Sequence, residues 1–183
     1  MEDNVISSQF IITLDVDKSL FERLQLLVRA GFNVVEINTT DTDLLMAVIS
    51  KFDTLRVGIG NITDVQQLEN CYQAGAHFAS SLGFSPNLAK TALVYSINYL
   101  PGIGTVSEAM QVMELGYDQA RPYPADLAFC TTLSKYFPKL RLFPSAIIWG
   151  QADDYLTLES VAAVGILNPE HQVLHSMAHI ACF

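Results

Sequence analysis

Two charged side chains interrupt segments that otherwise have the apolar pattern of buried strands. Glu36 lies in the run 34–37, and Arg121 lies in the run 119–122. Charged residues are rarely buried unless they are paired or functional. A guanidinium matches a carboxylate in shape and charge, so Arg121 is the natural partner of Glu36. The pattern predicts a pocket around this pair that binds carboxylates, although Glu36 at a strand end could instead reach solvent.

Other residue patterns give weaker indications of chemistry. His171, His175 and His179 recur every four residues and share one face of the last expected helix. Histidines at such spacing can chelate zinc, but no Glu or Cys motif supports them, and a polar helix face is favoured. No Ser-His-Asp or Cys-His arrangement is found. We therefore predict neither a metal site nor a cofactor.

Short strands and amphipathic helices alternate along the whole chain, with no linker between them. A Pro-Gly turn is expected at 101–102, and helix caps at Asp17 or Ser19, within 39–41, and at Asp126. The expected strands are 9–15, 33–38, 55–60, 77–81, 95–100, one that begins near 119, 140–146 and 161–165. The expected helices run to Gly31 and to 52, then over 63–73, 86–93, 105–115, 126–137, 153–158 and 169–182.

Eight such units fit a (β/α)8 TIM barrel, because parallel strands joined by right-handed crossovers close on themselves. The fold class is therefore α/β, with residues 1–183 as one compact domain. An open doubly wound sheet is the alternative. In a barrel, the functional side chains lie at the C-terminal ends of the strands.

Composition excludes several classes of partner. The chain has 183 residues, of which 50% are hydrophobic and 16% charged, as expected of a sheet covered by helices. A net charge of −9 disfavours nucleic acid. The acidic residues 1–4 do not resemble a signal peptide, and no apolar run approaches the roughly 18 residues of a membrane span. Cys71, Cys130 and Cys182 are widely spaced, so we expect reduced thiols in a cytoplasmic protein.

Several motifs together resemble the 2-keto-3-deoxy-6-phosphogluconate / 4-hydroxy-2-oxoglutarate (KDPG/KHG) aldolase family. They are Val-Glu-Ile at 35–37, Gly-Ile-Gly-Asn at 58–61, Gln-Ala-Gly-Ala-His-Phe-Ala at 73–79, Pro-Gly-Ile-Gly-Thr-Val-Ser-Glu at 101–108 and Tyr-Pro-Ala-Asp at 123–126. The resemblance covers nearly the whole chain. It implies a barrel, a homotrimer, and a lyase that cleaves 2-oxo-3-deoxy sugar acids or 4-hydroxy-2-oxoglutarate to pyruvate and an aldehyde.

The resemblance also implies roles for individual residues. Glu36 matches the glutamate that shuttles protons, and Tyr123 matches the aromatic residue that packs on the pyruvyl group. Thr40 falls where the family has an arginine that grips the substrate carboxylate, and Asn61 where it has a threonine. The expected substrate-binding residues are thus Thr40, Asn61, Pro101, Tyr123 and Ser145, with Glu36 and Arg121 as the catalytic pair.

One departure from the family pattern concerns the nucleophilic residue of the active site. Arg121 stands two residues before Tyr123, where the family has the lysine that forms a Schiff base. An arginine stays protonated at working pH and forms no such imine. The five lysines of this chain fall on helices or turns outside the expected lumen. The segments expected to cradle phosphate, 145–148 and 165–166, have also lost glycines, which predicts weak binding of phosphorylated ligands.

Three functions remain open at this stage. The family implies carbon–carbon lyase chemistry on a 2-oxo acid. The residues indicate instead a non-catalytic protein that binds a carboxylate or 2-oxo acid as its small-molecule partner. A structural subunit of an oligomer is the third possibility.

Overall fold

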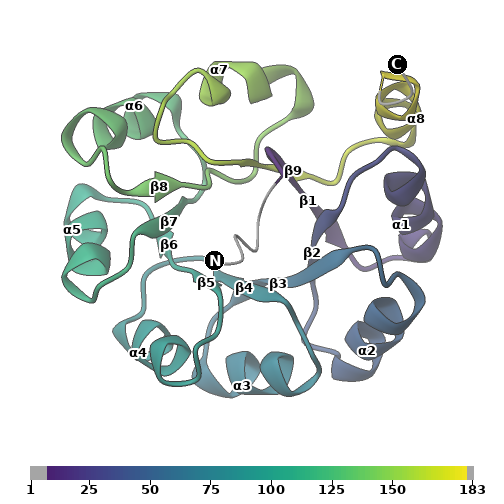
Figure 1. Cartoon of the computed structure of the whole chain (residues 1–183), viewed down its shortest axis with the longest axis horizontal. Helices are drawn as coiled ribbons and strands as arrows, with labels where there is room; N and C mark the ends of the chain where they lie inside the picture. Colours follow the sequence, from purple (N-terminus) through teal and green to yellow (C-terminus); the bar gives the residue numbers. More distant parts are fainter. Residues whose placement is uncertain (1–7, 181–183) are drawn as a thin grey trace.

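The computed structural model describes the backbone of residues 8–180 and the side chains of residues 8–176. All strand pairs are parallel, and they form a six-stranded sheet of order β5-β4-β3-β2-β1-β9 and a three-stranded sheet of order β6-β7-β8. Figure 1 shows the strands curling around a common centre with the helices on the outside. The fold is thus α/β with a curled parallel sheet.

The strands are short and follow one another with a helix between most of them. Their bounds are β1 (Phe10–Asp15), β2 (Val34–Asn38), β3 (Arg56–Ile62), β4 (Phe78–Ser81), β5 (Tyr99–Leu100), β6 (Gly102–Ile103), β7 (Gln119–Pro122), β8 (Arg141–Leu142) and β9 (Val164–Leu167). Isolated parallel bridges join Leu142 to Val161 and Ile147 to Ile166, so the three-stranded sheet also contacts the region around β9.

The described helices are α1 (Leu20–Arg29), α2 (Thr42–Lys51), α3 (Val65–Gln73), α4 (Pro86–Val94), α5 (Val106–Glu114), α6 (Leu127–Tyr136), the 3-10 turn η1 (Trp149–Gln151), α7 (Ala152–Leu156) and α8 (His171–Ile180). Five of the described helices, α2 to α6, begin at capping side chains that the sequence makes visible. Asp41 and Asp126 accept hydrogen bonds from the first turns of α2 and α6, as predicted. Thr105 and Glu108 form a reciprocal capping box on α5. Ser19 precedes α1 but makes no side-chain cap.

Alternate residues along the strands face two separate apolar clusters. One cluster, which includes Ile12 and Val35, packs against the helices on the outside of the sheet. The other lies inside the curled sheet and consists of Ile11, Val34, Phe78, Leu100, Phe143 and Ala163. Because successive side chains point to opposite faces, Thr13, Glu36 and Ser80 lie on the inner face, two residues beyond this inner cluster. The polar site thus rests on an apolar base.

The strand register brings the polar inner residues side by side. Thr13 is paired with Glu36, and Glu36 with Gly58 on the next strand. A Cβ on Gly58 would lie 2.3 Å from the ring of Phe78, so glycine there leaves room for that ring in the inner cluster. On the other sheet, Gly102 is paired with Arg121. The register fixes which side chains can meet inside the sheet.

Several predicted boundaries differ from the structure. The Pro-Gly turn at 101–102 is wrong, because Gly102 continues as β6 and pairs with β7. A Cβ on Gly102 would lie 2.5 Å from the Ser81 carbonyl oxygen, so glycine serves a close approach of two strands there. The strand expected at 95–100 is only Tyr99–Leu100, since Ser96 has a positive φ of 54°. The predicted strands 140–146 and 161–165 are β8 and β9, shortened or shifted.

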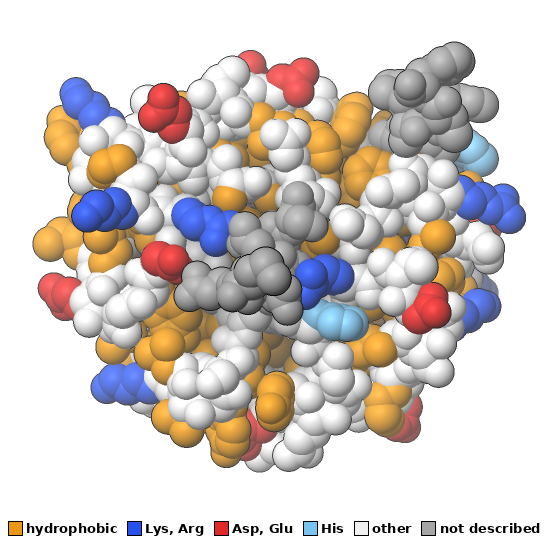
Figure 2. Space-filling model, viewed as in Figure 1, with side chains coloured by type: hydrophobic (Ala, Val, Ile, Leu, Met, Phe, Trp, Pro, Cys, Tyr) orange, Lys and Arg blue, Asp and Glu red, His pale blue; other side chains and the backbone are white. Residues whose placement is uncertain are grey.

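A group of apolar side chains on α4 and α5 remains exposed. Val94 is 79% exposed, and Leu93, Tyr95, Met110 and Met113 are each more than one third exposed. Figure 2 shows apolar surface over this part of the molecule, with charged side chains of both signs spread around it. In the described part of the chain, no helix has the length and apolarity needed to cross a membrane.

Candidate functional site

Arg121 of β7 and Glu36 of β2 form a buried ion pair inside the curled sheet. The Arg121 Nη2 atom lies 3.2 Å from Glu36 Oε1, and the two side chains are only 2% and 1% exposed. The predicted pairing is therefore observed, and the alternative of a solvent-reaching Glu36 is wrong. Burial of both partners in a low-dielectric interior strengthens their attraction, but it also makes an unpaired partner costly.

Two hydroxyl groups complete the surroundings of the Glu36 carboxylate. The Ser80 hydroxyl donates to Oε2 at 2.6 Å, and the Thr13 hydroxyl donates to Oε1 at 3.3 Å. Both side chains are buried, on β4 and β1. Hydrogen-bond donors on either side hold the carboxylate in one orientation.

Arg121 is held by three different groups and keeps one donor free. Its Nη1 donates to the Ser81 carbonyl at 3.0 Å, and its guanidinium carbon lies 4.5 Å from the centre of the Tyr123 ring. Its Nε is buried and donates to no described residue. Glu36 therefore accepts from one nitrogen of the guanidinium, Nη2, whereas a carboxylate placed side-on to the guanidinium could accept from both Nε and Nη2. A buried donor without a partner in the protein is unusual, and a ligand or water would supply its acceptor.

Gly60 of β3 allows two polar side chains to approach the backbone next to the ion pair. A Cβ at this position would lie 2.3 Å from Asn38 Oδ1 and 2.6 Å from Glu36 Oε1. Asn38 Oδ1 is buried and accepts no hydrogen bond from the described residues. An acceptor without a donor thus faces the same region as the ion pair, and a ligand hydroxyl could supply that donor.

A second polar network connects the ends of β9, β1 and β2. The Asp15 carboxylate accepts from the amide of Asn38 at 2.7 Å and from the amide of Asn168 at 2.6 Å. Arg23 is 6% exposed and donates to the Asp15 carbonyl at 2.8 Å and to Asn168 Oδ1 at 3.4 Å. These bonds fix the C-terminal ends of three strands, and they hold Asn38, which lies beside Gly60 as Glu36 does.

Ser81 links the ion pair to the junction between β5 and β6. Its hydroxyl pairs with Tyr99 Oη at 2.6 Å and accepts from the Gly102 amide at 3.0 Å. Burial raises the pKa of Tyr99 to about 12, so its hydroxyl stays protonated at neutral pH. The Ser81 carbonyl that receives Arg121 therefore belongs to a well-fixed part of the backbone.

The remaining predicted site residues differ in burial and in their contacts. Pro101 directly follows β5, and Ser145 lies three residues after β8. Both are buried, and the Ser145 hydroxyl donates to the Phe143 carbonyl at 3.3 Å. Asn61 is half-buried with a φ of 61°, and its Oδ1 accepts no hydrogen bond from the described residues. Thr40 is exposed in the loop after β2, and no hydrogen bond of its side chain to the described residues is found.

No amine lies near the ion pair in the part of the chain that the structure describes. All five lysines are exposed, as predicted: Lys18, Lys51, Lys90, Lys135 and Lys139. The described cysteines are also unsuited to nucleophilic chemistry, because burial raises the pKa of Cys71 to about 11 and that of Cys130 to about 12. Both thiols are free, as predicted, while Cys182 lies outside the described residues.

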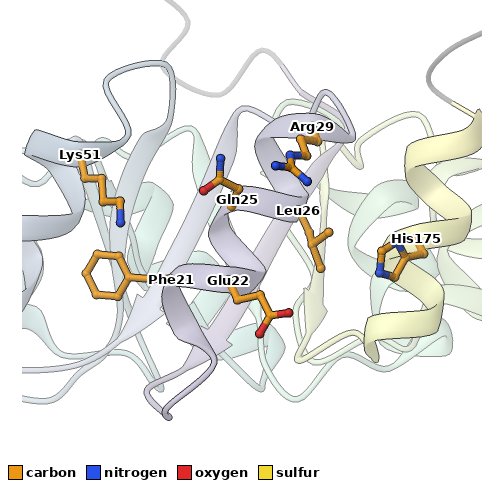
Figure 3. A pocket seen from close by; sticks show the side chains of 7 residues that line it. All are labelled: Phe21, Glu22, Gln25, Leu26, Arg29, Lys51 and His175. Carbon is orange, nitrogen blue, oxygen red and sulfur yellow. The ribbon is translucent and has the colours of Figure 1, made fainter.

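The histidines of α8 gather no metal ligands among the described residues. His171 and His175 are exposed, and the side chain of His179 lies outside the described part. His175 lines a cavity of about 480 Å³ on the outer face of α1. Figure 3 shows Lys51 beside Phe21 on one side of this helix and His175 on the other. The side chains that line this cavity are mostly exposed, and none of them is a predicted site residue.

Sequence reasoning did not identify Thr13, Ser80 or Ser81 as part of the site. A signal was present for Thr13 and Ser80, because each is a hydroxyl residue within a short apolar strand, on the face that alternation assigns to the inside; Ser81 lies on the opposite face and takes part through its backbone carbonyl. Choosing between the two faces required the register with Glu36, which a single strand does not reveal.

Comparisons with known proteins agree with these observations. The family model for KDPG and KHG aldolase matches residues 4–174. The KHG/KDPG aldolase of Escherichia coli strain K12 is 32% identical over 147 residues, which cover 76% of this chain and 69% of that protein. The 2-dehydro-3-deoxy-phosphogluconate aldolase of Dickeya dadantii is 33% identical with the same coverage. The solved KDPG aldolase of Legionella pneumophila superimposes with a TM-score of 0.85 at 24% identity, over 97% of this chain and 92% of that one. The chain belongs to the KDPG and KHG aldolase family.

Proposed function

We propose that this family member binds a small 2-oxo acid, or a related carboxylate, at the Arg121–Glu36 pair and does not act through a lysine imine. One observation carries the proposal. A guanidinium whose Nε–H donates to no described residue occupies the interior beside Glu36, while every lysine of the chain is exposed.

The free donor of Arg121 supports binding of a planar, anionic ligand. A carboxylate, or the carboxylate and oxo oxygens of a 2-oxo acid together, can accept from Nε as well as from Nη2, whereas Glu36 accepts from this guanidinium through Nη2 alone. Tyr123 lies against the guanidinium and offers an aromatic face to an apolar part of the ligand. A related solved protein, the aldolase of Legionella pneumophila, holds pyruvate as a covalent carbinolamine, which favours a 2-oxo acid as the ligand class.

Among the residues that the structure describes, the lack of a buried amine separates this site from imine chemistry. A class I aldolase needs a neutral lysine amine that attacks the ketone carbon. Arg121 remains protonated and is a poor nucleophile, so its contribution is limited to charge and hydrogen bonding. We therefore propose a non-covalent binding function in place of aldol cleavage through an imine.

Calorimetric titration with oxamate, an unreactive isostere of pyruvate, tests the binding function. We expect saturable binding by the wild type and its loss in Arg121→Met. Arg29→Met, which removes an exposed arginine of α1, is the matched control and should bind normally. The double variant Glu36→Gln/Arg121→Met leaves no buried charge unpaired and checks whether lost binding is merely lost folding. Normal binding by folded Arg121→Met would refute the assignment.

We propose also that the two sheets form one closed (β/α)8 barrel and a single domain. The support comes from Pro101, which directly joins β5 to β6, and from the bridges that link the region after β8 to the region of β9. Slow amide exchange at Ile147, whose amide donates to the Gly165 carbonyl, would agree with closure, and fast exchange would argue against it.

The exposed apolar side chains of α4 and α5 support a homotrimer, which the family resemblance implied. Val94, at 79% exposure, is the most open of them. Contiguous exposed apolar surface commonly marks an interface between subunits. Light scattering should give a trimer for the wild type and a smaller species for Val94→Asp.

We also propose a cytoplasmic location, which fits the free thiols of Cys71 and Cys130.

A further inference from the structure

We propose that Arg121 and Glu36 enolise a bound 2-oxo acid without any covalent intermediate. This inference rests on the proposed binding function, and it adds a chemical step to it. In that step Glu36 removes a proton from C3 of the ligand, while Arg121 stabilises the negative charge that develops on the oxo oxygen.

The distance between the two side chains suits these two roles, with Glu36 as the base and Arg121 as the group that stabilises the developing charge. Glu36 Oε1 and Arg121 Nη2 lie 3.2 Å apart, and Nε is free to donate. In a 2-oxo acid, the oxo oxygen and the C3 hydrogens are attached to neighbouring carbon atoms. A ligand whose oxo oxygen accepts from the guanidinium therefore presents its C3 hydrogens to the adjacent carboxylate, within the reach that a general base requires.

The step balances without a further reactant. The C3–H bond breaks and its proton moves to a Glu36 carboxylate oxygen. The electron pair of that bond forms the C2–C3 double bond, and the carbonyl π electrons move onto the oxo oxygen. Return of a proton from Glu36 to C3 restores the ligand. In heavy water the returning nucleus is deuterium, so the net result is exchange of the C3 hydrogens.

The surroundings of the pair favour both roles. Ser80, at 2.6 Å, and Thr13, at 3.3 Å, orient the carboxylate through their hydroxyl groups. The Ser81 carbonyl holds Nη1 at 3.0 Å, so the guanidinium is fixed where the charge would develop. A permanently charged donor in a buried site needs little reorganisation as that charge forms, which is the usual source of electrostatic stabilisation. Arginine is suited to this task, although it cannot form an imine.

Proton NMR of pyruvate in heavy water tests the inference, because it follows loss of the methyl signal directly. We expect the wild type to accelerate exchange roughly 100-fold over buffer, the lower range for a general base. Glu36→Gln should lose the acceleration. Glu22→Gln, which changes an exposed glutamate of α1, is the matched control and should retain it. Oxamate, which has no C3 hydrogen, should inhibit exchange by the wild type.

Saturation-transfer NMR on the same samples separates this inference from the proposed function. Wild-type binding of pyruvate without accelerated exchange would overturn enolisation and leave the binding function intact. Absence of binding would overturn both. If Glu36→Gln does not fold, inhibition by oxamate decides, because exchange that oxamate does not reduce cannot arise in this pocket. A pyruvate adduct trapped on a lysine by borohydride would contradict the non-covalent route.

Discussion

Replacing Glu36 by glutamine tests how strongly the buried ion pair contributes to stability. The substitution keeps the shape of the side chain and one carbonyl oxygen, which can still accept from Ser80. It removes the counter-charge of Arg121, whose guanidinium is 2% exposed. The folded state of Glu36→Gln thus contains a buried, uncompensated positive charge.

The contacts of Glu36 indicate how much the substitution should lower the free energy of unfolding. Its carboxylate accepts from Ser80 at 2.6 Å, from Arg121 at 3.2 Å and, more weakly, from Thr13 at 3.3 Å. Hydrogen bonds to charged groups contribute about 1.5–3 kcal/mol each. Breaking one side of a buried ion pair typically costs about 3–5 kcal/mol. We expect Glu36→Gln to lower the free energy of unfolding by about that amount and the Tm by roughly 10 °C.

Urea unfolding followed by circular dichroism measures this loss, with Arg121→Met and the double variant completing a cycle. Because the double variant leaves no unpaired charge, it should be more stable than the sum of the two single losses predicts, by at least about 1 kcal/mol. Glu22→Gln on the exposed face of α1 serves as control and should unfold like the wild type. A loss below about 1 kcal/mol in Glu36→Gln, or additive losses in the cycle, would refute the reasoning.

Two further predictions follow from the same site. Arg121→Lys should form a weak imine with pyruvate, trapped by borohydride and stronger at alkaline pH where more of the amine is neutral. Adding Thr40→Arg should increase the trapped fraction, because a cation at the mouth positions the carboxylate. If the single and double variants both stay unmodified, either Arg121 is not at the lysine position or the pocket is closed. Gly60→Ala should destabilise the chain by about 1–3 kcal/mol in thermal unfolding, since its methyl group would lie 2.3 Å from the Asn38 amide oxygen. Gly150→Ala, where a Cβ meets nothing within 4 Å, should be nearly neutral, and equal losses would contradict the steric account.

The alternation of strands and helices and the ion pair were predictable from the sequence. Glu36 and Arg121 could be matched because a buried charge requires a partner, whatever the details of the fold. The caps at Asp41 and Asp126 were predictable for a similar reason, since they satisfy local backbone donors.

Features that depend on register and close approach could not be predicted. Pro101 and Gly102 have the composition of a turn, but Gly102 pairs with Arg121 of β7 and lies close to the Ser81 carbonyl. Ser80 meets Glu36 only because β4 and β2 flank β3 in this register. Local sequence carries no information about such neighbours, which are distant in the chain.

Borohydride reduction of the wild-type chain with pyruvate tests the central claim most directly. The measurement is intact-protein mass spectrometry at a pyruvate concentration where saturation transfer detects binding. Because an arginine lies beside Glu36 and all lysines are exposed, we predict bound pyruvate and an unmodified protein mass. A pyruvate adduct on any lysine under these conditions would show that imine chemistry persists and would contradict the account.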